Sequence, residues 1–174
     1  MLPASVVRVS VGRVRVALCA GALITGAGVS AAPAGAVDGG WTGDYSMVTY
    51  ASQKTGTSPA AGQPEPDFSG TFTFGTTCTS STCIATANGP ASSNPTVPNP
   101  LHYTWNGQSW VTVYDWVWDC STGDDTPSEW SPARSWTTYT PQSDGTLRGV
   151  WHTDISTGSC RGSVVMPVAA LPAQ

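Results

Sequence analysis

Residues 110–119 read Trp-Val-Thr-Val-Tyr-Asp-Trp-Val-Trp-Asp, the clearest pattern in the chain. Aromatic side chains occupy positions 110, 114, 116 and 118, and valine or aspartate occupies every odd-numbered position. Successive side chains of a β-strand point to opposite faces of a sheet, so a period of two predicts a strand. One face of this strand would carry Trp110, Tyr114, Trp116 and Trp118.

Runs with the same alternation lie on both sides of this segment. Residues 68–74 place three phenylalanines and a glycine on one face, and residues 147–155 place Trp151 on a face with small and aliphatic residues. Turn signals separate the runs, notably Asn106-Gly107 and Ser143-Asp144-Gly145. The chain therefore reads as strands joined by turns, with few helix-forming residues.

Eight strands are predicted in this way, and they make the fold class all-β. Their ranges are 41–50, 68–77, 83–88, 101–106, 109–119, 134–140, 146–155 and 160–168. Short connections between neighbours predict an antiparallel meander, and closure of eight strands into a barrel would remove the exposed edges. We expect a closed, lipocalin-like barrel, with a two-sheet sandwich as the alternative. Residues 121–132 are expected to form a loop.

The first 36 residues have the order of a secretory signal. Residues 1–15 carry three arginines and no acid, residues 16–29 are apolar and small, and the segment ends in Ala34-Gly35-Ala36. We expect cleavage before Val37, with an uncleaved N-terminal anchor as the alternative. Residues 37–174 would then form a single β domain stapled by disulfides, secreted or associated with the cell envelope.

Charge restricts the partners of that domain. Removal of the signal leaves four of the seven basic residues and all eleven acidic ones, a formal charge of −7. An acidic surface disfavours nucleic acid and anionic membranes. No apolar run of membrane-spanning length follows residue 36, so no helical span is expected in the mature chain.

Four cysteines remain after the signal, an even number in an exported chain, which predicts two disulfides. Cys78 and Cys83 flank a turn-like tetrapeptide between two strands and are expected to pair with each other. Cys120 and Cys160 would form the second bridge. The spacing lacks the Cys-x-x-Cys pattern of zinc sites, so no metal is expected.

Groups that could perform catalysis are scarce. His102 and His152 are the only histidines, and no Gly-x-Ser-x-Gly motif occurs. Two residues apart on a strand, His152 and Asp154 would have Cβ atoms about 7 Å apart and are not expected to bond. A small secreted hydrolase that uses His152 with Asp154 or Asp119 is nevertheless one functional alternative.

Acidic residues gather from Asp115 to Glu129, but their spacing matches no known site. Asp115 and Asp119 share a strand face about 13 Å apart, too far for the carboxylate pair of a glycosidase. Calcium could bind between Asp119 and Glu129, although no EF-hand spacing is present. A solvated acidic turn is the preferred interpretation.

The aromatic face offers a better candidate site. Trp110, Tyr114, Trp116 and Trp118, joined by Trp151, would form plain core, the wall of a ligand pocket, or an exposed platform. The leading hypothesis is a non-catalytic binding module of the cell envelope or medium that takes an envelope glycan, a lipid or a protein. No cofactor is expected, and a structural envelope component is a further alternative.

Several short motifs carry a resemblance over essentially the whole domain. They are Gly40-Trp41-Thr42-Gly43-Asp44-Tyr45, Ser69-Gly70-Thr71-Phe72, Tyr103-Thr104-Trp105-Asn106-Gly107, Trp118-Asp119-Cys120, Cys160-Arg161-Gly162 and Val165-Met166-Pro167, together with the Cys78 to Cys83 spacing. In these the chain resembles a group of small exported proteins of mycobacteria and related actinobacteria. The resemblance implies export and a cysteine-stapled domain, and it implies no particular reaction. The opening Gly39-Gly40-Trp41 is similar to the Gly-x-Trp of lipocalin-like barrels.

Overall fold

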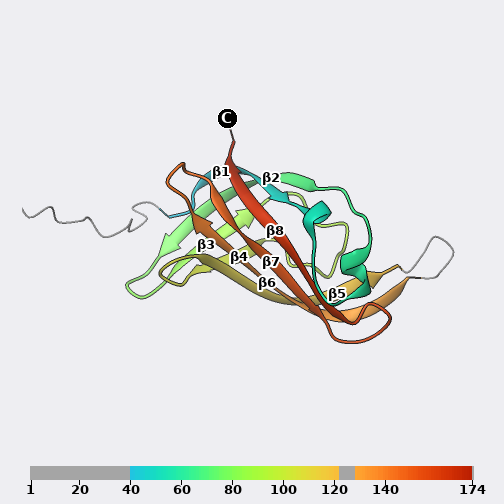
Figure 1. The fold of residues 1–174 in the computed structure, drawn as a ribbon. Coiled ribbons are helices and arrows are strands. Elements are labelled where there is room, and N and C mark those ends of the chain that lie inside the picture. Colours follow the sequence, from blue (N-terminus) through green and yellow to red (C-terminus); the bar gives the residue numbers. More distant parts are fainter. Residues whose placement is uncertain (1–39, 122–127, 174) are drawn as a thin grey trace, which may run out of the picture. The chain divides into compact units, whose positions relative to one another are not determined.

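Eight antiparallel strands follow one another around a closed barrel in the computed structural model, which describes residues 40–121 and 128–173 (Figure 1). The strands are β1 (Gly43–Thr49), β2 (Phe68–Cys78), β3 (Cys83–Asn88), β4 (Leu101–Trp105), β5 (Trp110–Cys120), β6 (Glu129–Pro141), β7 (Leu147–Ile155) and β8 (Gly162–Pro172). Each strand pairs with the next, and β8 returns to β1. The predicted all-β closed meander is confirmed, and the sandwich alternative is wrong.

β6 begins at Glu129 rather than at residue 134, so the predicted loop 121–132 was too long at its C-terminal end. The pairing of β5 with β6 continues as far as Cys120 and Glu129. Pro132 lies just beyond Ala133 and Ile155, the last pair of β6 with β7. Its carbonyl accepts a hydrogen bond from Ser156 N. The missing N–H of Pro132 therefore removes no hydrogen bond from that ladder.

β8 continues to Pro172 rather than ending at residue 168, and this extension closes the barrel. The added residues Ala169, Ala170 and Leu171 pair with β1. Their low β propensity gave no sign of a strand in the sequence. β1 itself begins at Gly43, so Trp41, which was expected in this strand, lies before it.

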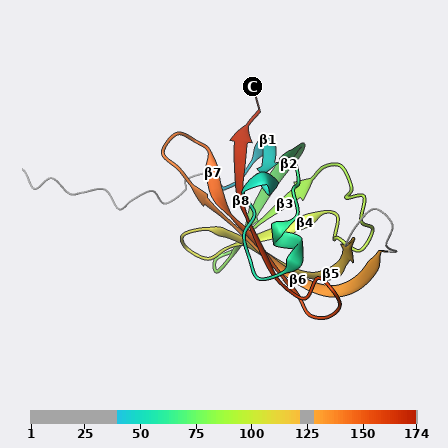
Figure 2. The same ribbon diagram turned by 45° about the vertical axis from the view of Figure 1, so that its right-hand side comes forward.

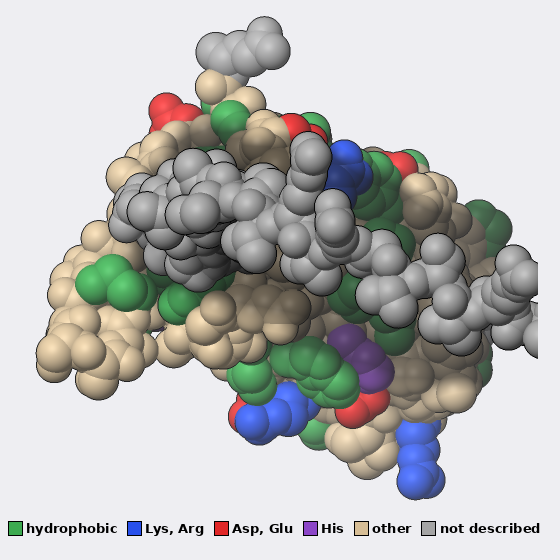
Figure 3. All heavy atoms as spheres, turned by 60° about the vertical axis from the view of Figure 1, so that its left-hand side comes forward, with side chains coloured by type: hydrophobic (Ala, Val, Ile, Leu, Met, Phe, Trp, Pro, Cys, Tyr) green, Lys and Arg blue, Asp and Glu red, His purple; other side chains and the backbone are tan. Residues whose placement is uncertain are grey.

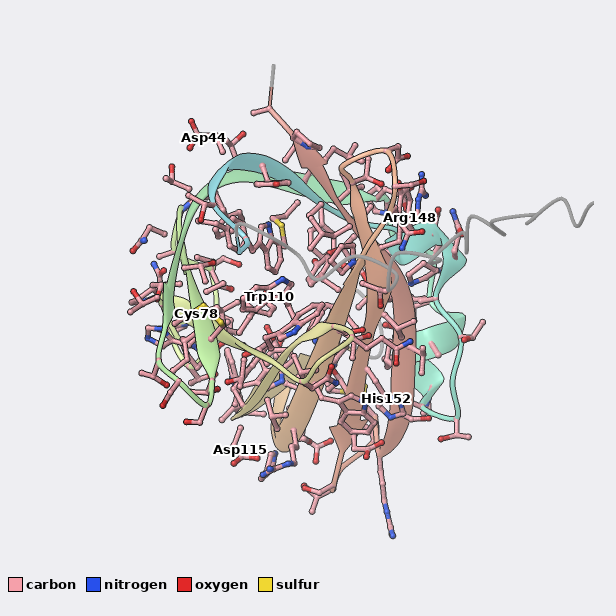
Figure 4. All side chains as sticks on the ribbon, turned by 90° about the vertical axis from the view of Figure 1, so that its left-hand side faces the viewer. Asp44, Cys78, Trp110, Asp115, Arg148 and His152 are labelled. Atoms are coloured by element: carbon pink, nitrogen blue, oxygen red, sulfur yellow. A yellow bond between two sulfur atoms is a disulfide. The ribbon has the colours of Figure 1, made fainter. Side chains whose placement is uncertain are left out.

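Trp41 fills one end of the barrel interior. Its indole is 2% exposed and stacks on Phe74, with ring centroids 3.9 Å apart and planes 11° apart. Tyr103, Trp110 and Tyr139 surround the same ring from three other strands. In Figure 4 Trp110 lies between the walls of the barrel, whereas Asp44 and Asp115 lie at the periphery. These rings and the buried aliphatic residues around them, which include Leu147 and Val168, form the first core cluster.

A second core cluster fills the other part of the interior. It contains Met166, Val164 and the Cys120–Cys160 bridge, with Trp116 and Trp118 packed against it. Small residues on the inner face of β6 leave room for these indoles, because residues such as Ala133 and Ser135 occupy little volume. The rings of Trp116 and Trp118 therefore point inward, as Trp110 does in the first core cluster, and the platform interpretation of the β5 aromatic face is wrong.

Both predicted disulfides are present. Cys78 and Cys83 pair directly across the β2–β3 hairpin, with Cα atoms 4.0 Å apart. Cys120 at the end of β5 is joined to Cys160 ahead of β8, with Cα atoms 5.8 Å apart. The second bridge is buried, whereas Cys78 is exposed.

The free half of the β8 edge is covered by the chain that follows β1 (Figure 2). Two short 3-10 turns, η1 (Ala51–Gln53) and η2 (Pro59–Gly62), lie in this segment. Its backbone bonds to β8 at three places, Tyr50 N to Pro167 O, Thr55 with Val165, and Ser58 N to Ser163 O. The edge is thus satisfied without a regular strand. In the part of the chain that the structure describes, no helix has the length and apolarity needed to cross a membrane.

Candidate functional site

Two short strands leave one part of the barrel wall without a ladder. β2 pairs with β3 only from Thr73 onward, and β4 pairs with β5 only through Thr104 and Trp105. The first residues of β2 therefore pair with β1 but not with β3, and most of β5 pairs with β6 but not with β4. The two strands face each other across a gap in the barrel wall. Residues 89–100, which connect β3 to β4, cross this gap, and we call them the crossing loop.

Side chains of the crossing loop replace the missing strand on the edge of β5. Asn94 Nδ2 donates to Val117 O at 2.7 Å, and Val117 N donates to Thr96 Oγ1 at 3.0 Å. Thr96 also donates its hydroxyl and its backbone N–H to Asn94 Oδ1, at 2.6 and 3.0 Å. At the β2 side, Gly89 lies so close to the Phe72 ring that a Cβ there would be only 2.2 Å from it. The loop is therefore held at both sides of the gap.

Replacing Thr96 by valine should loosen the loop without changing its volume. Hydrogen exchange of the Val117 amide is expected to accelerate by up to about tenfold, because this amide loses the Thr96 hydroxyl as its acceptor. Amide exchange followed by NMR measures the effect, and Thr77→Val on the exposed surface of β2 is the matched control. Unchanged exchange at Val117 would show that Thr96 does not hold the loop.

Beneath the crossing loop lies a pocket of about 390 Å³. β2 and the loop form its apolar wall, with Phe68, Phe72, Val97 and Pro98 among the lining residues. Residues that reach water surround its mouth, including Ser69, Ser92, Ser93 and Asn99. A volume of this size and an apolar lining are typical of sites for small ligands.

The floor of the pocket carries hydrogen-bonding groups within an apolar surrounding. Tyr103 and Tyr139 are each 3% exposed, and Tyr114, Thr137 and Trp151 complete this surface. Burial raises the pKa of all three tyrosines, most strongly those of Tyr103 and Tyr139. The phenol groups therefore stay protonated at any physiological pH and can donate hydrogen bonds.

Of the five predicted site residues, Tyr114 and Trp151 line this pocket. Trp110 is buried in the first core cluster. Trp116 and Trp118 pack against the second core cluster, where Trp116 Nε1 donates to Ser135 Oγ at 2.8 Å. Sequence reasoning did not select the crossing loop or the phenylalanines of β2 as pocket residues. The alternation in 68–74 and the proline-rich segment before Leu101 were the available signals.

His152 differs from the expectation in one respect. Its Nε2 lies 3.0 Å from Asp154 Oδ1, so the prediction that the two side chains do not bond is wrong. Side-chain reach closes the gap between the Cβ atoms, and the imidazole also stacks on Trp136 with centroids 3.7 Å apart. Figure 3 shows a histidine at the surface between hydrophobic and acidic side chains. Neither His152 nor Asp154 lines the pocket, and exposed His102 contacts Thr86 at 3.1 Å.

Asp115 and Glu129, the first and last members of the acidic group, have structural partners. Arg134 donates to Asp115 at 3.0 Å between exposed side chains. Glu129 accepts from Ser159 N at 3.0 Å and Ser159 Oγ at 2.8 Å, and these bonds lower the pKa of Glu129. Within residues 40–121 and 128–173, no group of three metal-ligating side chains occurs. Asp124 and Asp125 lie outside the described residues.

Comparison with known proteins places the domain in a family. Residues 37–173 match the family model of the PknI serine/threonine-protein kinase sensor domain. The chain belongs to this family. No curated protein matches its sequence.

Two solved structures of the M. tuberculosis PknI sensor domain are similar to this chain. The monomer form has 18% identity and a TM-score of 0.57, covering 76% of this chain and 87% of its own. The dimer form has 20% identity and a TM-score of 0.49, covering 63% and 73% respectively. The first match shows a shared fold. The expected resemblance is thereby confirmed as far as a mycobacterial β-protein family is concerned.

Proposed function

We propose that this chain is an exported, non-catalytic sensor domain that binds a small ligand in the pocket beneath the crossing loop. Residues 1–36 serve as its cleaved signal peptide, and residues 37–174 act in the cell envelope or the medium. Membership of the PknI sensor-domain family supports a sensing role. The observation that carries the proposal is the pocket itself, a ring-lined cavity that opens through the wall of an otherwise packed barrel.

The chemistry of the lining favours binding over catalysis. The titratable side chains that line the pocket are tyrosines with raised pKa values, which are poor general bases at neutral pH. The His152–Asp154 pair lies on the outer surface of the barrel, away from this cavity. A hydrolase that uses His152 would therefore have to act without the pocket.

Blocking the mouth of the pocket tests this proposal. Ser93→Phe places a ring at the exposed mouth, and Ser80→Phe at the tip of the β2–β3 hairpin is the matched control. Intrinsic fluorescence is titrated with soluble envelope glycans and envelope lipids in detergent. We expect a saturable response that Ser93→Phe weakens by roughly tenfold or more, because the new ring occupies ligand space. No response, or a response equal in both variants, would contradict binding in the pocket.

A further inference from the structure

The pocket lining restricts the charge of its ligand. None of its lining residues is Asp, Glu, Lys, Arg or His. Moving an ionised group from water into such a cavity is costly when no opposite charge compensates it. If the proposed function holds, the buried part of the ligand is therefore uncharged.

The wall formed by β2 and the crossing loop favours an apolar body for this ligand. Phe72 and Val97 line it, and Phe68, which also lines it, is 49% exposed. A sugar carries hydroxyls on every side, and these would be buried against the wall without partners. The exposed polar groups of the pocket gather instead at its mouth, as Ser92 and Asn99 do.

Two hydroxyls in the interior of the pocket have no hydrogen-bond partner. They belong to Tyr103 and Tyr139, which line the pocket and bond with no side chain or backbone group of residues 40–121 and 128–173. Each side chain is only 3% exposed, yet neither phenol oxygen is sealed. The sealed polar atoms that lack a partner in the described structure belong to Trp41, Trp110, Ser131 and Trp151. Because both tyrosines line the pocket, a bound molecule can reach their hydroxyls from it.

The third tyrosine of the lining shows the contrast. The Tyr114 hydroxyl already has the side chains of Ser135 and Trp151 as hydrogen-bond partners. Its donor capacity is therefore used within the protein, whereas that of Tyr103 and Tyr139 is left for a ligand.

The two unpartnered hydroxyls belong to neighbouring rings. The ring centroids of Tyr103 and Tyr139 are 5.8 Å apart, with planes at 73°. Burial, and after it the repulsion between the phenol groups of the pocket, raises the pKa of both tyrosines, so both stay protonated. A carbonyl oxygen has two lone pairs and no hydrogen of its own, so one such atom can accept from both hydroxyls.

We infer that the pocket binds an uncharged apolar carbonyl compound, such as a ketone or an ester, whose carbonyl oxygen accepts from the hydroxyls of Tyr103 and Tyr139. The apolar part of the compound packs against the wall formed by β2 and the crossing loop. A buried donor without an acceptor costs free energy, which the carbonyl oxygen recovers. This inference rests on the proposed function and names the ligand class of the same site.

Three compounds with the same hexyl chain separate the contributions of carbonyl and charge. Methyl hexyl ketone has a neutral carbonyl, its methylidene analogue has a methylene group in place of the oxygen, and heptanoate carries a carboxylate. Displacement of the neutral dye phenylnaphthylamine from the exported domain measures their binding. Heptanoate should bind at least about tenfold more weakly than the ketone, because the pocket has no charge to compensate it.

Tyr103→Phe and Tyr139→Phe test the two donors, because each keeps the ring and removes only the hydroxyl. In each variant the ratio of the affinity for the ketone to that for the methylidene analogue should fall by about fivefold, since only the ketone loses a hydrogen bond. Tyr45→Phe is the matched control and should leave the ratio unchanged, because Tyr45 packs against the first core cluster but does not line the pocket.

Neither tyrosine replacement removes a hydrogen bond of the described structure, so both variants should keep the urea midpoint of the native domain. An unchanged affinity ratio in both variants would overturn the proposal, as would tighter binding of heptanoate than of the ketone. If the three compounds fail to displace the dye while a glycan or lipid gives a response that Ser93→Phe weakens, the carbonyl class is wrong and the proposed function stands. If no compound gives a response that Ser93→Phe weakens, both are wrong.

Discussion

Replacing Trp41 by alanine is expected to destabilise the domain by about 3–5 kcal/mol. The indole is 2% exposed, stacks on Phe74 and contacts the rings of Tyr103, Trp110 and Tyr139. It precedes β1, and its backbone carbonyl accepts from Thr76 Oγ1 at 2.6 Å. The substitution would leave a cavity at one end of the barrel. Equilibrium unfolding in urea, followed by circular dichroism, measures the change.

Trp41→Phe is the matched control for this experiment. Phenylalanine keeps a ring that can stack on Phe74, and it removes an indole N–H that has no hydrogen-bond partner within the described residues. We therefore expect a clearly smaller loss of stability than for alanine. A loss below about 1 kcal/mol for Trp41→Ala would show that Trp41 does not contribute to the core as its burial indicates.

Removing the Cys120–Cys160 bridge by a double replacement with alanine is expected to cost about 4 kcal/mol. The bridge closes a loop with a sequence separation of 40, and the unfolded chain gains entropy when that loop is opened. Both residues are almost fully buried in the second core cluster, so lost packing adds to the effect. Denaturation midpoints of the oxidised native domain and of the double variant give the difference in unfolding free energy.

The other bridge supplies the comparison. Cys78 and Cys83 have a sequence separation of 5, so the same chain-entropy argument gives only about 2 kcal/mol for their double replacement with alanine. The β2–β3 ladder already pairs these two residues, and Cys78 is exposed. If removing the Cys78–Cys83 bridge cost as much unfolding free energy as removing the Cys120–Cys160 bridge, or more, the entropic explanation of the longer loop would be contradicted.

Side-chain alternation was sufficient to predict the strands and their inward faces. Residues 147–155 illustrate this, because their predicted apolar face with Trp151 does point into the barrel. The ends of strands were harder to predict, since they depend on partners far away in the chain. Ala169 to Leu171 are in a strand because β1 pairs with them, and Glu129 because Cys120 does.

The candidate site was predicted only in part, for a related reason. Tyr114 and Trp151 were chosen as aromatic residues on inward faces, and both line the pocket. Trp116 and Trp118 satisfy the same rule but face the second core cluster. Alternation gives the face of a strand, and it carries no information about which part of an interior remains open. That depends on the lengths of β3 and β4 and on the path of the crossing loop.

The pairing of β1 with β8 has a consequence for the order of folding events. Residues 45–49 pair with β2 on one side, but on the other side they pair with residues 168–172, so closure requires contacts across nearly the entire domain. Contacts of such long sequence separation slow folding, because chain entropy is lost before they form. A chain folding as it is synthesised would keep that side of β1 open until β8 arrives, and chaperones that shield such edges would act during that interval.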